Sequence, residues 1–551
     1  MNLMLCLTAG MMLTSLALGE TITLDAASAT GGAKNKEGDT VYLTAAMGVK
    51  DEVRWEFASE LPAGAWKVTV DFNGKTGGAK NQHIGFVAGR TPLVDCYYIN
   101  TSGKQSFAMF TAMQSRGMLY RKSSQRGQDT AGIRSVSVEP LDVSATANMR
   151  WYLDCPVDGG SVTLPVPLAP GRIRASFPAK VSATWQCGER SFTTPAGTQA
   201  YLFLSSAAER ITVDGTAANV IIERHPVEAV PAMPVENGGE LIQTIDTAKT
   251  ETRTITLVGY SGGAAPSPAV FPYGKKYTIF TTWDDGRDMD MPLAETMKKH
   301  GFRGTFFMNR NSQMLAKLAE LEALGMEIGN HSWNHPAYYL SGYERCYAET
   351  ANMRRLLEGM VGHPVISFGY PFNYSPAYDE QGDYVVRSVS NAGIWSARGT
   401  ATGPNYIDEI KNPYGYTPDF HFNTGAERIS ARFKELTVKD GLVFHVWGHS
   451  YELAGSGMAT LEKVLASLEG NPDIWYTTAG EVYVWRWMRM NTQVDGGKKD
   501  ANGVTFTMTR PWLHPYLRTF PLTLKVPEGV TEIVYNGERR PVKDGLADIM
   551  W

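Results

Sequence analysis

Residues 277–290 read YTIFTTWDDGRDMD, an apolar run that ends in two adjacent aspartates and a glycine turn. An apolar run of this length that ends at a turn is typical of a buried strand. Asp284 and Asp285 then place two carboxylates at its carboxyl end. An acidic pair often does no more than begin a turn, so its meaning depends on what surrounds it.

The surrounding region, residues 275–490, alternates between two kinds of segment. Strand-like runs such as GTFFMN and LVFHVWG alternate with amphipathic helical stretches such as PLAETMKKH and MLAKLAELEALG. This pattern predicts parallel strands joined by helices, in an open doubly wound sheet or a closed barrel. In both folds the chemistry gathers at the carboxyl ends of the strands.

The rest of the 551-residue chain reads mainly as β structure, so we expect a multidomain protein. Short alternating runs broken by Gly, Asn, Ser and Pro predict β-sandwich-like domains before the α/β region and a small β domain after it. The expected segments are a signal peptide (1–19), a β-sandwich that is a candidate carbohydrate-binding module (20–143), a small β domain (144–227), a Pro- and Gly-rich linker (228–274), the α/β domain (275–490) and a C-terminal β domain (491–551).

Composition narrows the function classes. The net charge of −4 supplies no basic field for nucleic acid, so nucleic-acid binding is not expected.

The apolar start ends in Ala17-Leu18-Gly19, which is typical of a signal peptidase site and predicts a secreted, periplasmic or cell-surface protein. No Lys or Arg precedes that run, so an N-terminal anchor stays open, but no later segment is apolar enough to span a bilayer. Cys155 and Cys187 are a candidate disulfide, with buried free thiols as the equal alternative.

Two further strand ends carry histidines. GNHSWNHP places His331 and His335 four residues apart, and GLVFHVWGHS contains His445 and His449. Two histidines and one aspartate suit Zn²⁺ or another divalent transition metal and leave coordination positions open for water. A second aspartate beside the metal can take a proton from that water. The three strand ends together therefore indicate a metal hydrolase.

These motifs resemble the polysaccharide deacetylase family, carbohydrate esterase family 4. TTWDDG is similar to the family's TFDDG motif, HSWNH matches H-[ST]-x-x-H, and LVFH fits L-x-x-H, all in the family's order within 275–490. The resemblance implies a distorted (β/α)7 barrel. It also implies that Asp284 is the general base, that Asp285, His331 and His335 bind the metal, and that His445 is the general acid.

Supporting roles follow from the same resemblance. Ser332 would hold the metal-binding loop, and a backbone N–H near Tyr370 and Pro371 would hold the oxyanion. The family's third motif usually has an arginine before its Pro-aromatic pair, but SFGYPFN has Gly369 there. We expect Arg398, in IWSARG, to replace it, with a surface arginine as the alternative. His449 stays a lesser candidate for the acid.

The expected reaction is metal-dependent removal of an N-acetyl or O-acetyl group from a polysaccharide, with release of acetate. One divalent ion is expected, Zn²⁺ first and Co²⁺, Mn²⁺ or Ni²⁺ as alternatives. Two other functions stay open: hydrolysis of a small non-sugar amide on the same fold, and glycan binding by a surface protein with a residual barrel.

Overall fold

The computed structural model divides the chain into two compact units. Unit 1 contains residues 1–229 and 377–382, and unit 2 contains residues 230–376 and 383–551. The structure describes residues 240–551 without a break and, before them, residues 21–30, 34–37, 39–43, 52–73, 82–86, 94–95, 103–111, 114–122, 132–141, 149–157, 159–215 and 219–225. The predicted signal peptide lies outside the described residues.

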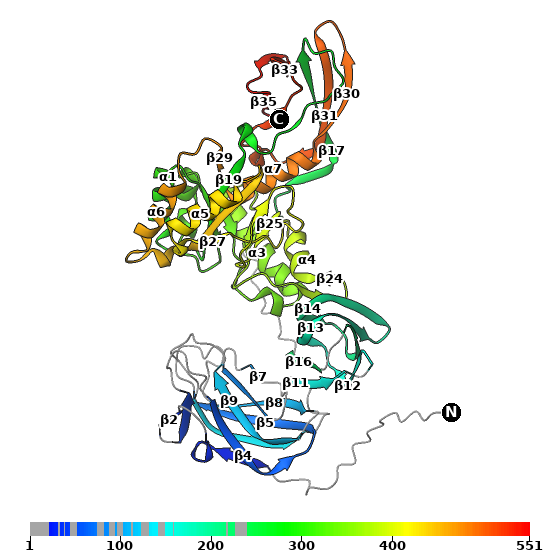
Figure 1. The fold of residues 1–551 in the computed structure, drawn as a ribbon, viewed down its shortest axis with the longest axis vertical. Helices are drawn as coiled ribbons and strands as arrows, with labels where there is room; N and C mark the ends of the chain where they lie inside the picture. The colour runs from blue at the N-terminus through cyan, green and yellow to red at the C-terminus, as the bar shows by residue number, and fades with distance from the viewer. Residues whose placement is uncertain are drawn as a thin grey trace, which may run out of the picture. The chain divides into compact units, whose positions relative to one another are not determined.

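The first part of unit 1 is a pair of antiparallel sheets (Figure 1). One contains β1, β2, β3, β10, β5 and β8, and the other runs in the order β4-β9-β6-β7. Alternate side chains of these strands, including Val68, Val70, Trp55 and Tyr120, are buried in one apolar cluster. The strands are β1 (Ile22–Asp25), β2 (Lys34–Glu37), β3 (Thr40–Leu43), β4 (Glu52–Leu61), β5 (Gly64–Asn73), β6 (Gln82–Phe86), β7 (Val94–Asp95), β8 (Gly103–Thr111), β9 (Ser115–Lys122) and β10 (Gly132–Pro140).

The second part of unit 1 continues the larger of these sheets, because β11 pairs with β8 in parallel. It has its own apolar cluster, centred on Trp185 and Leu202. Within that cluster Cys155 and Cys187 are buried, and the candidate disulfide does not join them. The strands are β11 (Arg150–Pro156), β12 (Ser161–Leu168), β13 (Gly171–Cys187), β14 (Arg190–Leu204), β15 (Ala208–Asp214) and β16 (Asn219–His225), joined at β14 by the short β23 (Ala377–Asp379).

Unit 2 contains the predicted α/β region. Parallel pairing runs from β25 through β22, β21, β20 and β19 to β28, and β27 pairs in parallel with the far side of β28. A parallel bridge from Arg398 to Tyr416 connects β25 with the segment that leads into β27. Within the described residues the pairings therefore lead around a ring of parallel segments. The strands of this ring are β19 (Tyr277–Asp284), β20 (Gly304–Met308), β21 (Glu327–Asn330), β22 (Ser367–Gly369), β25 (Ser396–Arg398), β27 (Phe420–His421) and β28 (Leu442–His449). The same sheet also contains β29 (Ile474–Tyr476), parallel to β19, and β26 (Asn405–Tyr406), antiparallel to β28.

Helices follow these strands along the chain and bury their apolar faces against them. Strand β19 is buried along almost its whole length, as expected of a parallel strand that is covered on both faces. In Figure 1, α5 and α6 lie together on one side of the strands, and α3 and α4 lie together on another. The helices are α1 (Asp290–Lys299), α2 (Leu318–Ala323), α3 (Tyr343–Val361), α4 (Tyr384–Asn391), α5 (Ala426–Leu436), α6 (Gly457–Leu468) and α7 (Ala479–Asn491).

The predicted linker 228–274 is wrong for its central part, which forms the 14-residue strand β17 (Ile245–Val258). β17 pairs with β31 (Gly503–Leu513) and β33 (Glu532–Tyr535), so the C-terminal sheet contains a strand from before the α/β region. Most of β17 is polar and only Ile255 and Leu257 are fully buried, which is why it reads as a linker. The other strands here are β30 (Gln493–Lys499), β34 (Glu538–Pro541), and a small sheet of β18 (Ser267–Pro268), β32 (Leu522–Lys525) and β35 (Leu546–Ile549).

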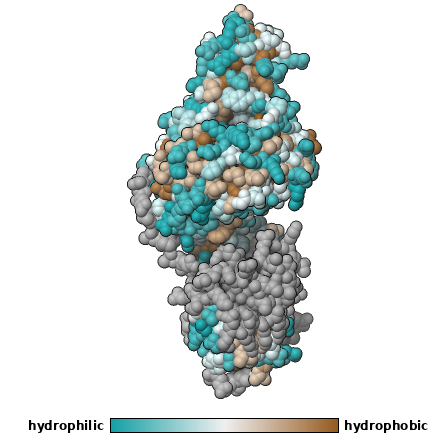
Figure 2. Space-filling view, turned by 90° about the vertical axis from the view of Figure 1, so that its left-hand side faces the viewer, coloured by the Kyte–Doolittle hydropathy of each residue, from teal (hydrophilic) through white to brown (hydrophobic). Residues whose placement is uncertain are grey.

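The C-terminal sheets also share one apolar cluster with α7 and Phe280 of β19. The predicted C-terminal β domain therefore belongs to the same unit as the α/β region. Figure 2 shows hydrophobic residues scattered among hydrophilic ones on the described part of one face. Among the described helices, none combines the length and the apolar character needed to cross a bilayer.

Candidate active site

The strand register brings three of the polar strand ends together. Asp284 ends β19 and is paired with Phe307 on one side and His449 on the other. β20 then pairs with β21, which ends at Asn330, directly before His331. Because all these strands are parallel, their carboxyl ends meet at one edge. The structure thus assembles the aspartate pair, the His331–His335 loop and the end of β28 at a single site.

Asp285, His331 and His335 form a compact set of groups that could hold one metal ion. Asp285 Oδ1 lies 3.7 Å from His331 Nε2 and 3.4 Å from His335 Nε2, and the two Nε2 atoms are 3.1 Å apart. Ligands of a tetrahedral Zn²⁺ with metal bonds of about 2.1 Å are roughly 3.4 Å from one another. The spacing therefore fits a single ion bound by these three atoms.

The hydrogen bonding of His331 supports this fit. Its Nδ1 lies 2.7 Å from the carbonyl oxygen of Gly369, so the Nδ1 proton is donated there and Nε2 is left as a lone-pair donor. Burial is the main cause that lowers the pKa of His331 to about 4, and the charge of nearby His335 adds to it. A neutral imidazole is the form that binds a metal.

The metal-binding loop has an unusual backbone. Asp285, Ser332 and His335 all have positive φ, at 78°, 66° and 58°. Residues other than glycine seldom adopt this conformation, and it tends to occur at functional sites. Hydrogen bonds hold it here: the Asn330 side chain accepts from the Ser332 N–H at 2.8 Å, and the Ser332 hydroxyl accepts from the His335 N–H at 3.0 Å. Ser332 therefore lies where the sequence analysis expects a residue that supports the loop.

Asp284 is buried and forms an ion pair with Arg398, whose Nη2 donates to its Oδ1. Burial alone would raise the pKa of Asp284, but Arg398, followed by His331 and His449, holds that pKa below its usual value. The guanidinium is itself fully buried, donates through Nε to the Thr282 hydroxyl at 3.0 Å, and lies over the Trp447 ring. Arg398 is thus buried and paired with Asp284, and it is not the surface arginine that was the alternative expectation.

His445 lies deeper along β28 than the strand ends that form the site. It is paired with Phe280, four residues before the Asp284 level of the sheet, and its side chain is fully buried against the Phe280 ring. Its Nε2 lies 2.8 Å from the Thr282 hydroxyl. Burial, followed by the charge of Arg398, lowers the pKa of His445 well below its usual value. Such a side chain is poorly placed to give a proton to a bound substrate, contrary to the role expected for it.

His449 lies at the level of Asp284 and is partly exposed. Its Nδ1 is 3.3 Å from Glu452 Oε2, and its backbone N–H donates to the same oxygen at 2.9 Å. Burial alone would lower the pKa of His449, but Glu452 and the two aspartates of the site raise it above its usual value. Glu452 also contacts His421, with 3.0 Å between Oε2 and Nε2. Glu452 was not predicted as a site residue, although its position three residues after His449 was a signal.

The Pro-aromatic pair is arranged differently from the expectation. The Tyr370 N–H donates to the Arg398 carbonyl oxygen at 3.0 Å, and the Tyr370 ring is buried. Tyr370 is therefore not available to hold an oxyanion, and Pro371 has no N–H. Phe372, the next residue, has a positive φ of 65° and an exposed ring whose centroid lies 5.0 Å from that of His335. Tyr451 is a second exposed ring, 4.9 Å from His449.

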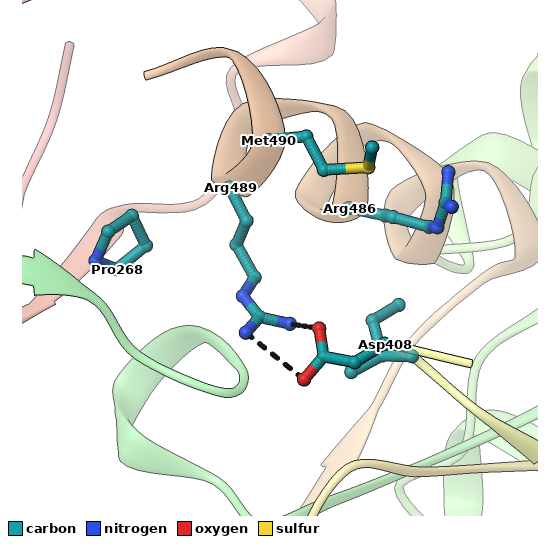
Figure 3. A pocket seen from close by; sticks show the side chains of 6 residues that line it. Pro268, Asp408, Arg486, Arg489 and Met490 are labelled. Carbon is teal, nitrogen blue, oxygen red and sulfur yellow. Dashed lines mark hydrogen bonds and ion pairs between the residues drawn. The ribbon is translucent and has the colours of Figure 1, made fainter. Parts of the chain in front are cut away.

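A separate cavity lies beside α7, away from these strand ends. It has a volume of about 290 Å³, and Figure 3 shows Arg489 paired with Asp408 inside it. The Arg489 and Asp408 side chains are 2.7 Å apart at their nearest atoms, and Arg486 donates to the Ile410 carbonyl oxygen at 2.8 Å. Both arginines are thus bound within the fold, and the cavity contains none of the groups expected to carry the chemistry.

One family model matches part of the α/β region. Residues 272–394 match the family model described as polysaccharide deacetylase. This segment belongs to the polysaccharide deacetylase family. The match contains the aspartate pair, His331 and His335, and it ends before Arg398, His445 and His449. The expected hydrolase class is confirmed at the level of the family.

Distant similarity to solved structures was also found. They include a family 4 carbohydrate esterase from Streptomyces lividans in complex with acetate (15% identity, 35% of this chain and 88% of that chain, TM-score 0.27). The peptidoglycan deacetylase PdaC from Bacillus subtilis is 14% identical over 39% of this chain and 94% of that chain, with a TM-score of 0.27. A family 4 acetyl xylan esterase from Clostridium thermocellum with a cobalt ion is 17% identical over 37% and 90%, with a TM-score of 0.27. No curated protein matches the chain.

Proposed function

We propose that the protein is a metal-dependent deacetylase that releases acetate from an N-acetylated or O-acetylated polysaccharide. The observation that carries this proposal is the convergence of Asp285, His331 and His335 beside the Asp284–Arg398 pair, within a polysaccharide deacetylase segment. We take the ring of parallel segments in unit 2 to be the distorted (β/α)7 barrel of that family. Because its substrate is a polysaccharide, the enzyme would act outside the cytoplasm.

Asp285 Oδ1, His331 Nε2 and His335 Nε2 would hold the metal, most readily Zn²⁺ and otherwise Co²⁺, Mn²⁺ or Ni²⁺. When bound, such an ion polarises a carbonyl group and lowers the pKa of water towards neutrality. The Gly369 carbonyl and the Asn330 and Ser332 side chains fix the two histidines in the orientation that this binding requires.

Asp284 is the proposed general base. Arg398 keeps its carboxylate ionised and fixes its position, and the Thr282 hydroxyl in turn fixes the guanidinium. An ionised carboxylate next to the metal set can take the proton of the attacking water. His445 contacts the Thr282 hydroxyl that binds Arg398, so His445 is a positioning residue for this chain of contacts.

His449 is the proposed general acid in place of His445. It lies level with Asp284 and is partly exposed, whereas His445 is four residues deeper along β28 and fully buried. Glu452 accepts from the backbone of His449 and contacts its Nδ1, so the ring is oriented with Nε2 free to give a proton to the leaving group. Glu452 is therefore a positioning residue for the acid.

The backbone N–H of Phe372 is the proposed donor to the oxyanion, since that of Tyr370 is already used. The exposed ring of Phe372 lies next to His335 of the proposed metal set, and the exposed ring of Tyr451 lies next to His449, the proposed acid. Aromatic faces of this kind contribute large apolar contact areas and suit the apolar face of a pyranose ring. They favour a sugar polymer over a small non-sugar amide.

The test is acetate release from a panel of acetylated polysaccharides by the full chain, after removal of metal with a chelator and after its return as Zn²⁺, Co²⁺ or Mn²⁺. We expect acetate release from at least one polymer that stops on chelation and returns with metal. Release from small amides alone would support the small-amide alternative. Binding to a polymer without any release would support a glycan-binding protein.

A further inference from the structure

A second cluster of metal-binding side chains, formed by His421, His449 and Glu452, lies beside the active site. Each of the three offers a ligand atom, and these atoms lie within 4.8 Å of one another. His421 ends β27, His449 ends the neighbouring β28, and Glu452 lies in the short helix that follows. The parallel pairing of β27 with β28 brings the two histidines to the same edge.

Two ligand separations of this second cluster are close to those of the first. Glu452 Oε2 is 3.0 Å from His421 Nε2 and 3.3 Å from His449 Nδ1. These separations are close to the roughly 3.4 Å expected between ligands of one tetrahedral Zn²⁺. The side chains of His421, His449 and Glu452 are 19%, 22% and 28% exposed, and the Nδ1 atom of His449 is buried with no hydrogen-bond partner among the described residues.

The donor types select the same class of ion. Two imidazoles and one carboxylate form a set that binds Zn²⁺ in catalytic sites, with a coordination position left for water. A hard cation such as Mg²⁺ or Ca²⁺ prefers oxygen ligands and would find only one carboxylate here. We propose that His421, His449 and Glu452 form a second, weaker Zn²⁺ site whose occupation inhibits the enzyme.

Inhibition follows from the double use of His449, and this part of the inference rests on the proposed function. An ion held by His449 and Glu452 would occupy the ring that the proposed function uses as the acid. It also takes Glu452 away from its contact with His449. The enzyme would then keep its first metal and lose its acid, so that activity rises and then falls as Zn²⁺ is added.

The direct test counts Zn²⁺ bound to the full chain by equilibrium dialysis after chelator treatment. We expect two ions in the wild type and one in His421→Ala, which leaves the first metal site and His449 in place. His331→Ala should lose the tighter ion and keep the weaker one. His300→Ala is the matched control, since His300 pairs with Glu469 at the end of α1, and it should still bind two. One ion in the wild type, or two in a folded His421→Ala or His421→Gln, would overturn the site.

The second measurement is acetate release against free Zn²⁺ concentration, normalised to the maximum of each variant. The wild type and His300→Ala should be inhibited by excess Zn²⁺, and His421→Ala should not. Two bound ions without inhibition would overturn the inhibitory role but keep the site. If no variant releases acetate at any Zn²⁺ concentration, the proposed function fails, and the count of bound ions still decides whether the second site exists.

Discussion

At the scale of single residues, the site depends on backbone conformations that side-chain type does not reveal. Asp285, Ser332, His335 and Phe372 all have positive φ, although none is a glycine. The motifs predicted which side chains meet, because each motif lies at the carboxyl end of a predicted parallel strand and these ends lie at one edge of the sheet. They could not predict that the Tyr370 N–H already donates to the Arg398 carbonyl oxygen, since that depends on how the chain continues after β22.

The choice between His445 and His449 is also a matter of single residues. Both histidines lie near the end of the same predicted strand, so either could be the general acid. His445 was predicted because the L-x-x-H motif ends there. Burial separates them, since His445 is fully enclosed and stacked on Phe280 while His449 is partly exposed beside Glu452. No pattern of residue types in VFHVWGH could show which of the two lies at the level of Asp284.

We predict that His449→Gln lowers kcat about 10²-fold to 10⁴-fold, the usual contribution of a general acid. His445→Gln should lower it less, because glutamine can still bond to Thr282 and keep Arg398 in place. The measurement is kcat for acetate release at one equivalent of Zn²⁺, with bound metal counted in each variant. A large loss in His445→Gln together with normal turnover in His449→Gln would restore the first assignment.

At the scale of elements, helix α1 begins with a buried carboxyl group. Asp290 is fully buried at the first position of α1, and burial is the main cause that raises its pKa to about 7. The nearby charges of Asp285 and Asp284 raise that pKa further. Between pH 3.8 and about 7 the folded chain therefore binds a proton at Asp290 that the unfolded chain does not bind. The contribution of Asp290 to stability is full below this window and falls as pH rises through it.

Asp290→Asn should consequently raise the melting temperature relative to the wild type at pH 8 and have little effect at pH 4. The measurement is the melting temperature of both proteins across this range. Asp288→Asn is the matched control, because Asp288 is exposed two residues earlier, and its difference from the wild type should change much less with pH. A pH-independent effect of Asp290→Asn would contradict the burial of an ionisable group at this position.

Strand β17 is the element that sequence reasoning missed. Its run of Thr, Lys, Glu and Arg gives few buried positions, and its partners β31 and β33 lie more than 240 residues later in the chain. Alternation over a whole strand is the usual signal of a half-buried strand. In β17 only Ile255 and Leu257, near the end of the strand, are buried. The alternation of apolar and polar residues is therefore too short to distinguish a strand from a polar linker.

Leu257→Ala should lower the free energy of unfolding by about 2 to 5 kcal/mol, because Leu257 is fully buried in the apolar cluster of unit 2. Thr254→Ala, at an exposed position of the same strand, should change it by less than about 0.5 kcal/mol. Chemical denaturation of the two variants gives both values. Equal, small effects would mean that the segment behaves as the linker that its composition suggests.

At the scale of the whole molecule, the sequence predicts the α/β region and its metal-binding set best. Both depend on short-range patterns: apolar runs followed by helices, and histidines four residues apart after a strand. Domain boundaries depend on pairings between distant strands. The parallel pairing of β8 with β11 and the pairing of β17 with β31 join segments that composition separates.

The central claim is that two adjacent aspartates have different tasks. Asp285 has its Oδ1 within 3.7 Å of both metal-binding histidines, and Asp284 is paired with Arg398. The most direct test compares bound Zn²⁺ and acetate release in Asp284→Asn and Asp285→Asn. The account predicts that Asp284→Asn keeps the metal and loses turnover, while Asp285→Asn loses both. Normal turnover in Asp284→Asn, or full metal binding and activity in Asp285→Asn, would contradict it.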